Sequence, residues 1–297
     1  MRRLMLRLAA LGGVVAIGWG GISMTDTKPA SPSPLASLQG DVGRGAYLAR
    51  ASGCIACHTD SESGGRPLAG GAPLETAFGT FYAPNLTTDT THGIGSWSIE
   101  EFARAVRQGE SPEGEPYYPA FPYGFYTRFS DQDIADLWAA FLTVPAVEQP
   151  SREQELSFPF NIRTGLHLWK GLYFEPQRFQ PLEDKSDMYN RGAFLVEAAG
   201  HCAACHTPRN LLGALDEEAQ WTGADGLPGG GASPAIAPSA LKQRGWTVQD
   251  LAYALRSGIT PDGDVMGASM GEVIQQGTSF LSDDDRQAIA TYLLTER

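Results

Sequence analysis

Two short runs of cysteine and histidine have the residue types and the spacing for covalent attachment of a haem. The first run is Cys54, Cys57 and His58, and the second is Cys202, Cys205 and His206. Two thiols three positions apart at the start of a helix can each bond a vinyl group of one porphyrin, and the adjacent histidine can then bind the iron. The sequence therefore predicts two covalently attached haem c groups, one at each run.

Other chemistries that use paired cysteines fit this spacing less well. Zinc sites of the double Cys-x-x-Cys kind place roughly 15 to 20 residues between the pairs, whereas Cys57 and Cys202 lie far apart in this chain. A thioredoxin-like pair needs a βαβ setting that the sequence does not indicate. Structural disulfides would leave the histidine after each pair unexplained.

The ligand on the opposite side of the second iron is predicted to be a methionine. Met270 follows the second run in a predicted loop. Methionine opposite histidine is the usual arrangement in an electron-transfer cytochrome, where the thioether raises the reduction potential. We therefore expect Met270 to bind the second iron, with Met266 as the alternative and core packing of both as the remaining possibility.

The first iron has no such methionine nearby. Phe121 occupies the position of Met270 in the first copy of the internal repeat described below, and no methionine lies between Met24 and Met188. The candidates are His92, a ligand from elsewhere such as His167, or no strong ligand at all. His201, next to Cys202, is expected to donate a hydrogen bond near the haem edge.

The two runs belong to two copies of one unit. Arg44-Gly45-Ala46-Tyr47-Leu48 recurs as Arg191-Gly192-Ala193-Phe194-Leu195, about ten residues before each run. Further along, residues 97–109 match residues 246–258 at a constant offset of 149 without a gap.

The matched segments contain helix start and stop signals. Ser98 with Glu101, and Thr247 with Asp250, have the spacing of a capping box, and each segment ends at a glycine. A second capped helix is predicted after Ser130 and another after Ser282, near the end of each copy. Matched tryptophans, Trp97 and Trp246, are expected to pack around the haems rather than to conduct electrons.

The composition indicates a globular chain of more than one domain. The 297 residues are 42% hydrophobic and 19% charged, which is enough apolar material for real cores. Neither copy has an alternating run long enough for a sheet, so we expect an all-α fold of two tandem cytochrome c domains joined by an aromatic-rich strap. Each domain would have about three short helices, and the haem would supply the centre of its core.

The domain boundaries follow from changes in composition. Three arginines precede the apolar run from Leu8 to Met24, so residues 1–24 are expected to be a signal peptide or an uncleaved inner-membrane anchor. Residues 25–39, rich in proline and serine, would be a flexible tether. The first domain would span residues 40–149, the strap residues 150–186 and the second domain residues 187–297.

The charge bears on the kind of partner. Asp and Glu total 34 against 22 Lys and Arg, for a net charge of −12. Nucleic acid is therefore not expected as a partner. The acidic field would attract a basic redox partner such as a cytochrome or an oxidase.

Over roughly residues 40–297 the chain resembles the dihaem cytochrome c subunits of membrane-associated periplasmic dehydrogenases that oxidise alcohols, gluconate or aldehydes. The motifs that carry this resemblance are Arg44-Gly45, Gly93-Ile94-Gly95-x-Trp97, Tyr118-Pro119-Ala120-Phe121-Pro122-Tyr123 and, most specifically, Gly200-His201-Cys202-x-x-Cys205-His206-Thr207-Pro208-Arg209-Asn210.

The resemblance implies a location on the periplasmic side of the bacterial inner membrane and a partner that is the catalytic subunit of a dehydrogenase. It implies that electrons pass from that subunit through the cytochrome to a quinone, a soluble cytochrome or an oxidase. In many relatives a methionine at the position of Phe121 binds the first haem, so the coordination of that haem is expected to differ here. The alternative function is a dihaem redox enzyme, such as a thiosulfate dehydrogenase or a peroxidase, that acts at the first haem.

Overall fold

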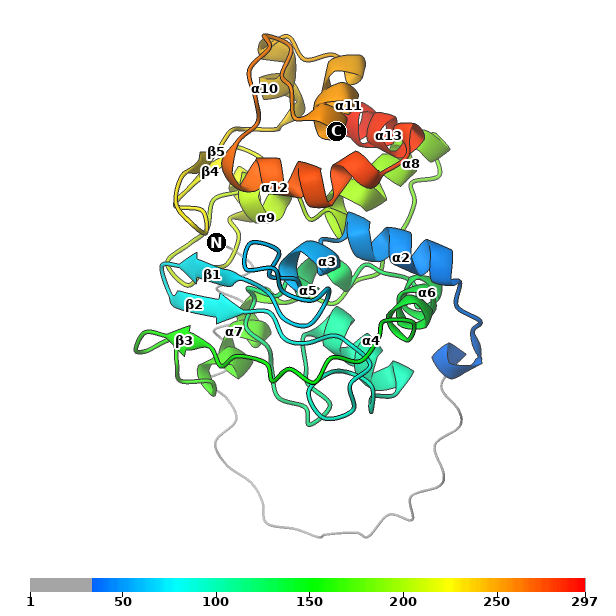
Figure 1. The fold of residues 1–297 in the computed structure, drawn as a ribbon. Helices are drawn as coiled ribbons and strands as arrows, with labels where there is room; N and C mark the ends of the chain where they lie inside the picture. Colours follow the sequence, from blue (N-terminus) through cyan, green and yellow to red (C-terminus); the bar gives the residue numbers. More distant parts are fainter. Residues whose placement is uncertain (1–33, 297) are drawn as a thin grey trace, which may run out of the picture.

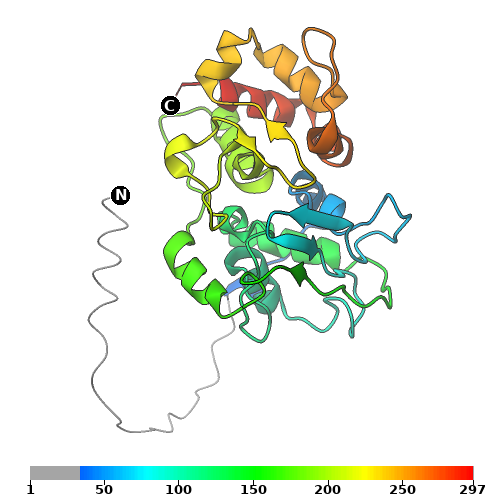
Figure 2. The same cartoon turned by 90° about the vertical axis from the view of Figure 1, so that its left-hand side faces the viewer.

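The computed structural model describes residues 34–296, which form two helical halves stacked on one another (Figures 1 and 2). The first half is drawn in blue to green in Figure 1, and the second half, above it, in yellow-green to red. Most of the regular structure in these residues is helical. This confirms the mainly α character that the sequence predicts.

A pair of crossing helices forms the framework of the first half. α2 (Val42–Ala51) packs against α6 (Asp131–Phe141), and Gly45 lets the two backbones meet, because a Cβ at this position would clash with the backbone oxygen of Asp136. Arg44 and Asp136 form a two-point ion pair beside the crossing, with Nε to Oδ2 at 2.7 Å and Nη2 to Oδ1 at 3.0 Å. The other helices of this half are η1 (Pro34–Ser37), α3 (Cys54–Cys57), α4 (Ile99–Gln108) and α5 (Tyr123–Tyr126).

The second half repeats this framework. α8 (Asp187–Phe194) packs against α13 (Asp283–Leu294), and a Cβ at Gly192 would clash with the backbone oxygen of Ala288. Arg191 binds Asp285 in the same two-point manner, at 2.8 Å and 2.7 Å. The repeated Arg-Gly pair therefore has one structural role in both halves. The other helices here are η2 (Leu195–Ala199, a π-helical turn), α9 (Ala203–His206), η3 (Glu217–Ala219), α10 (Pro238–Gln243), α11 (Val248–Ser257), α12 (Ala268–Gln276) and η4 (Thr278–Phe280).

The capped helices that the sequence predicts are present. α4 and α11 each begin with a complete capping box, and each ends at a glycine with a left-handed backbone, Gly109 with φ 63° and Gly258 with φ 75°. Ser130 and Ser282 cap α6 and α13 in the same way, each accepting a hydrogen bond from the backbone N–H three residues on. These predictions are confirmed.

The expectation that no sheet forms was wrong. β1 (Pro73–Thr76), β2 (Gly79–Tyr82) and β3 (Glu155–Leu156) form a small antiparallel sheet, in which Leu74 pairs with Phe81 and Thr80 with Glu155. Two further strands, β4 (Ala224–Asp225) and β5 (Ala232–Ser233), pair in the second half. Strands of two to four residues are too short to produce a detectable alternation in the sequence.

The segment from residue 150 to 186 contacts both halves but is only partly buried. Within it lie β3 and α7 (Gly165–Tyr173). Arg178 donates to the Thr127 carbonyl of the first half at 2.6 Å, and the Trp169 indole N–H donates to the Leu212 carbonyl of the second half at 2.9 Å. Phe158, in contrast, is 79% exposed. The apolar side chains of this segment are therefore less packed than their number suggests.

The N-terminal expectations fall largely outside the described residues. This applies to the signal peptide or anchor at 1–24 and to the tether up to residue 33. The rest of the predicted tether is not wholly extended, because Pro34–Ser37 form η1 with Leu35 buried. Among residues 34–296, no helix has the length and apolar character required to cross a bilayer.

Candidate functional site

The first Cys-x-x-Cys-His run forms a single helical turn. α3 covers Cys54–Cys57, begins after Gly53 in a left-handed conformation, and ends at His58. The three-residue spacing puts both cysteines on the same face of the turn. His58 is buried, and its Nδ1 lies 2.7 Å from the carbonyl oxygen of Pro84.

The second run has the same local structure. Cys202 precedes α9, and His206 ends it. The Nδ1 atom of His206 lies 2.8 Å from the carbonyl oxygen of Pro234. The threonine after each histidine makes the same kind of hydrogen bond in both copies. Thr59 Oγ1 accepts a hydrogen bond from the backbone N–H of Leu68, and Thr207 Oγ1 accepts one from the backbone N–H of Trp221. Leu68 and Trp221 both have positive φ.

These contacts prepare each histidine to bind a metal. A carbonyl at Nδ1 selects the tautomer with hydrogen on that atom and leaves the lone pair on Nε2, which is how second-shell groups orient metal-bound histidines. Burial lowers the pKa of His58 to about 4, although the Pro84 carbonyl partly opposes this. Burial also lowers the pKa of His206. Both imidazoles are thus neutral at pH 7 and can act as ligands.

The four thiols fit thioether attachment better than a thiolate site. All four cysteines are free of disulfides. Burial raises the pKa of Cys54 and Cys202 to about 12, and it also raises the pKa of Cys205. Zinc sites and reactive redox pairs rely on thiolates in environments that lower the pKa. The donor set of both runs therefore fits a c-type haem.

Met270 lies in a helix and not in the loop that the sequence suggests. It is near the start of α12, after Gly267, and packs against the hydrophobic core. The start of this helix has no signal in the sequence, because Gly267 precedes it and no side chain caps it. Met266 lies before α12 and is held by its backbone N–H, which donates to the Gly258 carbonyl at 2.7 Å.

The loops before Phe121 and Met270 share one register. The Tyr117 N–H donates to the Gly109 carbonyl at 2.8 Å, as the Met266 N–H does to Gly258, and these residues are related by the offset of 149. Phe121 therefore follows Tyr117 by the same number of residues as Met270 follows Met266. Its ring packs against the rings of Tyr117, Tyr123 and Tyr126, with centroid distances of 5.8–6.3 Å.

Within residues 34–296, the structure shows no contact that would orient His92 or His167 toward the first Cys-x-x-Cys-His run. His167 is exposed on α7. His92 is half-buried in a loop that is fixed through its backbone N–H, which donates to Asp89 Oδ1 at 2.6 Å. The main difference between the two sites is thus at this repeat position, where the first site has Phe121 among aromatic rings and the second has the thioether of Met270.

His201 contacts the first half of the molecule. Its ring packs against Tyr126 and Phe125 of the first half, with centroid distances of 5.7 Å and 5.9 Å. Burial lowers the pKa of His201 to about 4. The sequence analysis did not identify Pro84 and Pro234 as residues of the site. A comparison of the two copies could have found them, because each copy has a proline, preceded by a small residue, after its Cys-x-x-Cys-His run.

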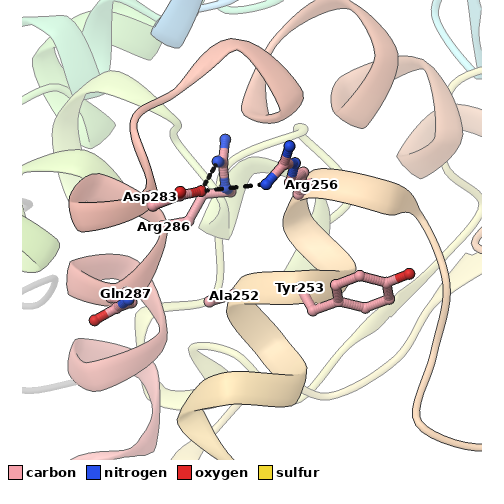
Figure 3. A pocket seen from close by; sticks show the side chains of 6 residues that line it. All are labelled: Ala252, Tyr253, Arg256, Asp283, Arg286 and Gln287. Atoms are coloured by element: carbon pink, nitrogen blue, oxygen red, sulfur yellow. Dashed lines mark hydrogen bonds and ion pairs between the residues drawn. The ribbon is translucent and has the colours of Figure 1, made fainter.

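A pocket of about 160 Å³ between α11 and α13 lies apart from both runs (Figure 3). Arg256 and Arg286 both point at Asp283, and Arg286 also donates to the carbonyls of the preceding turn. Each charged side chain of this pocket therefore already has an ion-pair partner within the fold.

Comparison with known proteins agrees with this geometry. The family model "Cytochrome c" matches residues 189–296. The chain is 40% identical over 288 residues to a "Diheme cytochrome c-type" protein of Cereibacter sphaeroides, and the match covers 96% of each chain. It is 38% identical over 269 residues to the fructose dehydrogenase cytochrome subunit of Gluconobacter japonicus, and 39% identical over 263 residues to the gluconate 2-dehydrogenase cytochrome c subunit of Pantoea cypripedii.

The matches differ in how much of each relative they cover. They extend over 90% and 85% of this chain, but over only 54% and 58% of the fructose and gluconate dehydrogenase subunits. The fold and the two runs define a c-type cytochrome. Within that class, the chain belongs to the family of diheme c-type cytochromes, which confirms the resemblance predicted from the motifs.

Proposed function

We propose that the protein carries two haem c groups, one at each Cys-x-x-Cys-His run. Cys54 and Cys57 would attach the first and Cys202 and Cys205 the second, with His58 and His206 as the iron ligands. The single observation that carries this proposal is the duplicated contact between each histidine Nδ1 and a proline carbonyl, which leaves Nε2 available in both halves. A bound haem supplies an iron centre that takes up and releases one electron.

We also propose that residues 40–149 and 187–297 are two tandem cytochrome c domains, with residues 150–186 as the strap between them. The duplicated helix crossings, ion pairs and capping boxes support this division. The match of the cytochrome c model to residues 189–296 supports it for the second domain.

Met270 is proposed as the sixth ligand of the second iron. It packs against the core near the start of α12, and its thioether is the ligand type that favours electron transfer. The second site would then change oxidation state with little rearrangement. The burial of His206 would keep its imidazole neutral throughout.

The function proposed for the whole protein is an electron relay between a dehydrogenase and the respiratory chain. Relatives named as cytochrome subunits of fructose, gluconate and alcohol dehydrogenases support a dehydrogenase catalytic subunit as the electron donor. The net charge of −12 supports a basic cytochrome or oxidase as the acceptor, with a quinone as the other class. Covalent haem attachment and the apolar N-terminal run support a position on the periplasmic side of the inner membrane.

An experiment on the native complex tests the relay. The full chain is tagged in its own host and purified in mild detergent, and alcohols, sugars, sugar acids and aldehydes are added one class at a time. We expect one class to reduce both haems of the complex and none to reduce the haems of the chain after its partners are removed. Oxidation of a substrate by the partner-free chain would contradict the relay.

One observation favours a second candidate function, a redox enzyme that acts at the first haem. Phe121 lies where the second half has Met270, so the first iron has no local thioether. An iron open on one side could bind peroxide or an oxyanion of sulfur, with the second haem as its electron port. Turnover of peroxide or thiosulfate by the partner-free chain would favour this candidate over the relay.

A further inference from the structure

The chain makes the same hairpin turn after α4 and after α11. Glu110 pairs with Pro116 in the first copy, and Ile259 pairs with Val265 in the second, at the constant offset of 149. The backbone hydrogen bonds inside the two turns match as well. The turns closed by these two pairs are called the first hairpin and the second hairpin.

The first hairpin is covered by the segment that connects the two halves. The Arg163 guanidinium, in the turn before α7, donates to the Pro116 carbonyl at 2.7 Å, and Lys170 Nζ lies 2.6 Å from Glu110 Oε1. Leu166 of α7 is buried, and Pro116 is less than 2% exposed. An element that carries basic and apolar side chains therefore packs on this hairpin.

The second hairpin, in contrast, is open to solvent. Val265, the counterpart of Pro116, is 68% exposed, and Ile259 is 37% exposed. Opposed residues of an antiparallel pair place their side chains on one face, so these two residues form one apolar surface. The loop between α11 and α12, which holds this hairpin, lies far from α7 in both views (Figures 1 and 2). Apolar side chains that gather on one exposed surface are typical of a site for a protein partner.

Acidic side chains surround this apolar pair. Asp262 and Asp264 lie in the turn of the second hairpin, and both are exposed. The nearest basic side chain in the sequence, Arg256, already lies with Nη1 3.7 Å from Oδ1 of Asp283. A partner that fits this surface must bring basic side chains around an apolar centre. The segment formed by α7 and the turn before it has this character, and it covers the first hairpin.

The second hairpin also leads directly to the proposed ligand of the second iron. The Met266 N–H, next to Val265, donates to the Gly258 carbonyl at 2.7 Å, and α12 with Met270 follows. The Cδ1 atom of Ile274, in α12, would lie 3.9 Å from a Cβ built on Gly258, so the base of the hairpin and this helix are packed together. A protein seated on the hairpin would therefore lie beside the second iron site.

We propose that the second hairpin is the docking surface for the electron acceptor, and that this acceptor is a basic c-type cytochrome. The inference rests on the proposed function, in which the second run carries a haem. In the docked pair the second iron passes from ferrous to ferric, and the ferric iron of the acceptor gains that electron. No covalent bond forms or breaks. The first hairpin cannot serve in this way, because the segment with α7 already occupies it.

Two matched double variants test the surface. Asp262→Asn with Asp264→Asn removes two charges from the second hairpin, and Glu113→Gln with Glu115→Gln removes two charges from the equivalent positions of the first. Both pairs change the net charge equally. Each full-length holoprotein is first assayed for two haems per chain. Absence of haem from the unmodified protein would refute the proposed function itself, whereas the outcomes that follow concern only the docking surface.

The readout is the second-order rate of electron transfer from the reduced protein to ferric mitochondrial cytochrome c, a basic probe, at low ionic strength. This rate should fall as salt is added. We expect the Asp262 and Asp264 variant to transfer severalfold more slowly, and the Glu113 and Glu115 variant to retain most of the original rate. Equal slowing in both variants would assign the effect to net charge and overturn the inference. An unchanged rate in the Asp262 and Asp264 variant would overturn it as well.

The apolar part of the surface has its own test. Val265→Lys places a cation at the centre of the proposed contact and should also slow the transfer severalfold, whereas Val42→Lys makes the same change on an exposed part of α2 and should not. If Val265→Lys fails to retain haem, a carbodiimide, which joins carboxylates to lysines, is applied to the unmodified protein with the probe. We expect Asp262 or Asp264 in the cross-linked peptide. Cross-links confined to other acidic side chains would overturn the inference.

Discussion

The Tyr47 hydroxyl donates a hydrogen bond to Asp285 Oδ2 at 2.6 Å, across the boundary between the two halves of the molecule. The same hydroxyl accepts the backbone N–H of Ser282 at 3.0 Å. Asp285 is already bound by Arg191, so Tyr47 joins the ion pair that fastens α8 to α13. Nearby, the Arg50 guanidinium lies 4.0 Å from the centre of the Phe280 ring. The halves are thus joined directly, in addition to the segment between them.

Removal of the Tyr47 hydroxyl should weaken this junction. Tyr47→Phe is expected to lower the free energy of unfolding by about 1 kcal/mol. Both hydrogen bonds of the Tyr47 hydroxyl are lost, but Asp285 keeps Arg191 and Ser282 is exposed, so water can replace the partner of its N–H. Phenylalanine already stands at the matching position of the second copy, Phe194, so the ring itself is compatible with the fold. Denaturant unfolding of the holoprotein measures the change. Tyr253→Phe, on an exposed part of α11, is the control, and an equal loss in both variants would contradict a specific role for Tyr47.

The Asp285 ion pair should make stability depend on pH. Burial alone would raise the pKa of Asp285, but hydrogen bonds from Arg191 and Tyr47, together with the Arg191 charge, outweigh it and lower the pKa. A carboxyl with a lowered pKa stabilises the fold above its unfolded pKa of about 4, and this stabilisation is lost as the pH falls through the folded value.

Asp285→Asn is therefore expected to cost about 1–2 kcal/mol of unfolding free energy at neutral pH, because Arg191 is partly exposed and its charge is screened. The difference from the unmodified protein should shrink as the pH drops below about 4. Denaturant unfolding over this pH range measures it, with the exposed Asp225→Asn as the control. A difference that grows on acidification would show that the sign is wrong.

Two glycine substitutions should have opposite effects. Gly192→Ala would place a Cβ against the backbone oxygen of Ala288, where α8 and α13 meet, and is expected to cost about 2–4 kcal/mol of unfolding free energy. Gly171→Ala, in α7, has nothing within 4 Å of the added Cβ and should stabilise the protein by about 0.5–1 kcal/mol. Thermal unfolding of both variants is the measurement. Similar melting temperatures would mean that the crossing is looser than the structure indicates.

Phe121 should decide the coordination of the first iron. We expect carbon monoxide to bind one of the two reduced haems in the unmodified protein, and Phe121→Met to abolish this binding by supplying the thioether that the second half has at Met270. The reciprocal variant, Met270→Phe, should leave the second iron without its thioether ligand, so that carbon monoxide binds both reduced haems. Spectroscopic titration measures these values. No binding to the unmodified protein would show that another side chain, such as His92, closes the first iron.

The repeat and its motifs made the central features of this molecule predictable. Each capping box, the glycine that ends each helix, and the Arg-Gly pair before each run are local patterns, and the structure places them in matching positions. The family and the mostly helical fold followed from them. In contrast, β1 and β2 form through a tight turn in which Thr76 Oγ1 donates to the Gly79 carbonyl at 2.8 Å, and strands this short have no distinct pattern of their own.

Long-range contacts were the other part that could not be predicted. Tyr47 and Asp285 are 238 positions apart, and nothing in either local sequence indicates that they meet. The same holds for His201 and Tyr126, whose rings meet only because of how the halves are stacked. The turn before Met270 makes the same backbone contact as its counterpart in the first copy, but the helix that contains Met270 was missed because α12 begins directly after a glycine, without a side-chain cap.

Covalent attachment of one haem at each run can be measured on the intact protein. The holoprotein is made in a host that attaches haem c, its intact mass is determined, and its peptides are mapped. We expect an added mass of two haems, one on the peptide with Cys54 and Cys57 and one on the peptide with Cys202 and Cys205. A mass equal to that of the polypeptide alone, or with a haem on only one of these peptides, would contradict it.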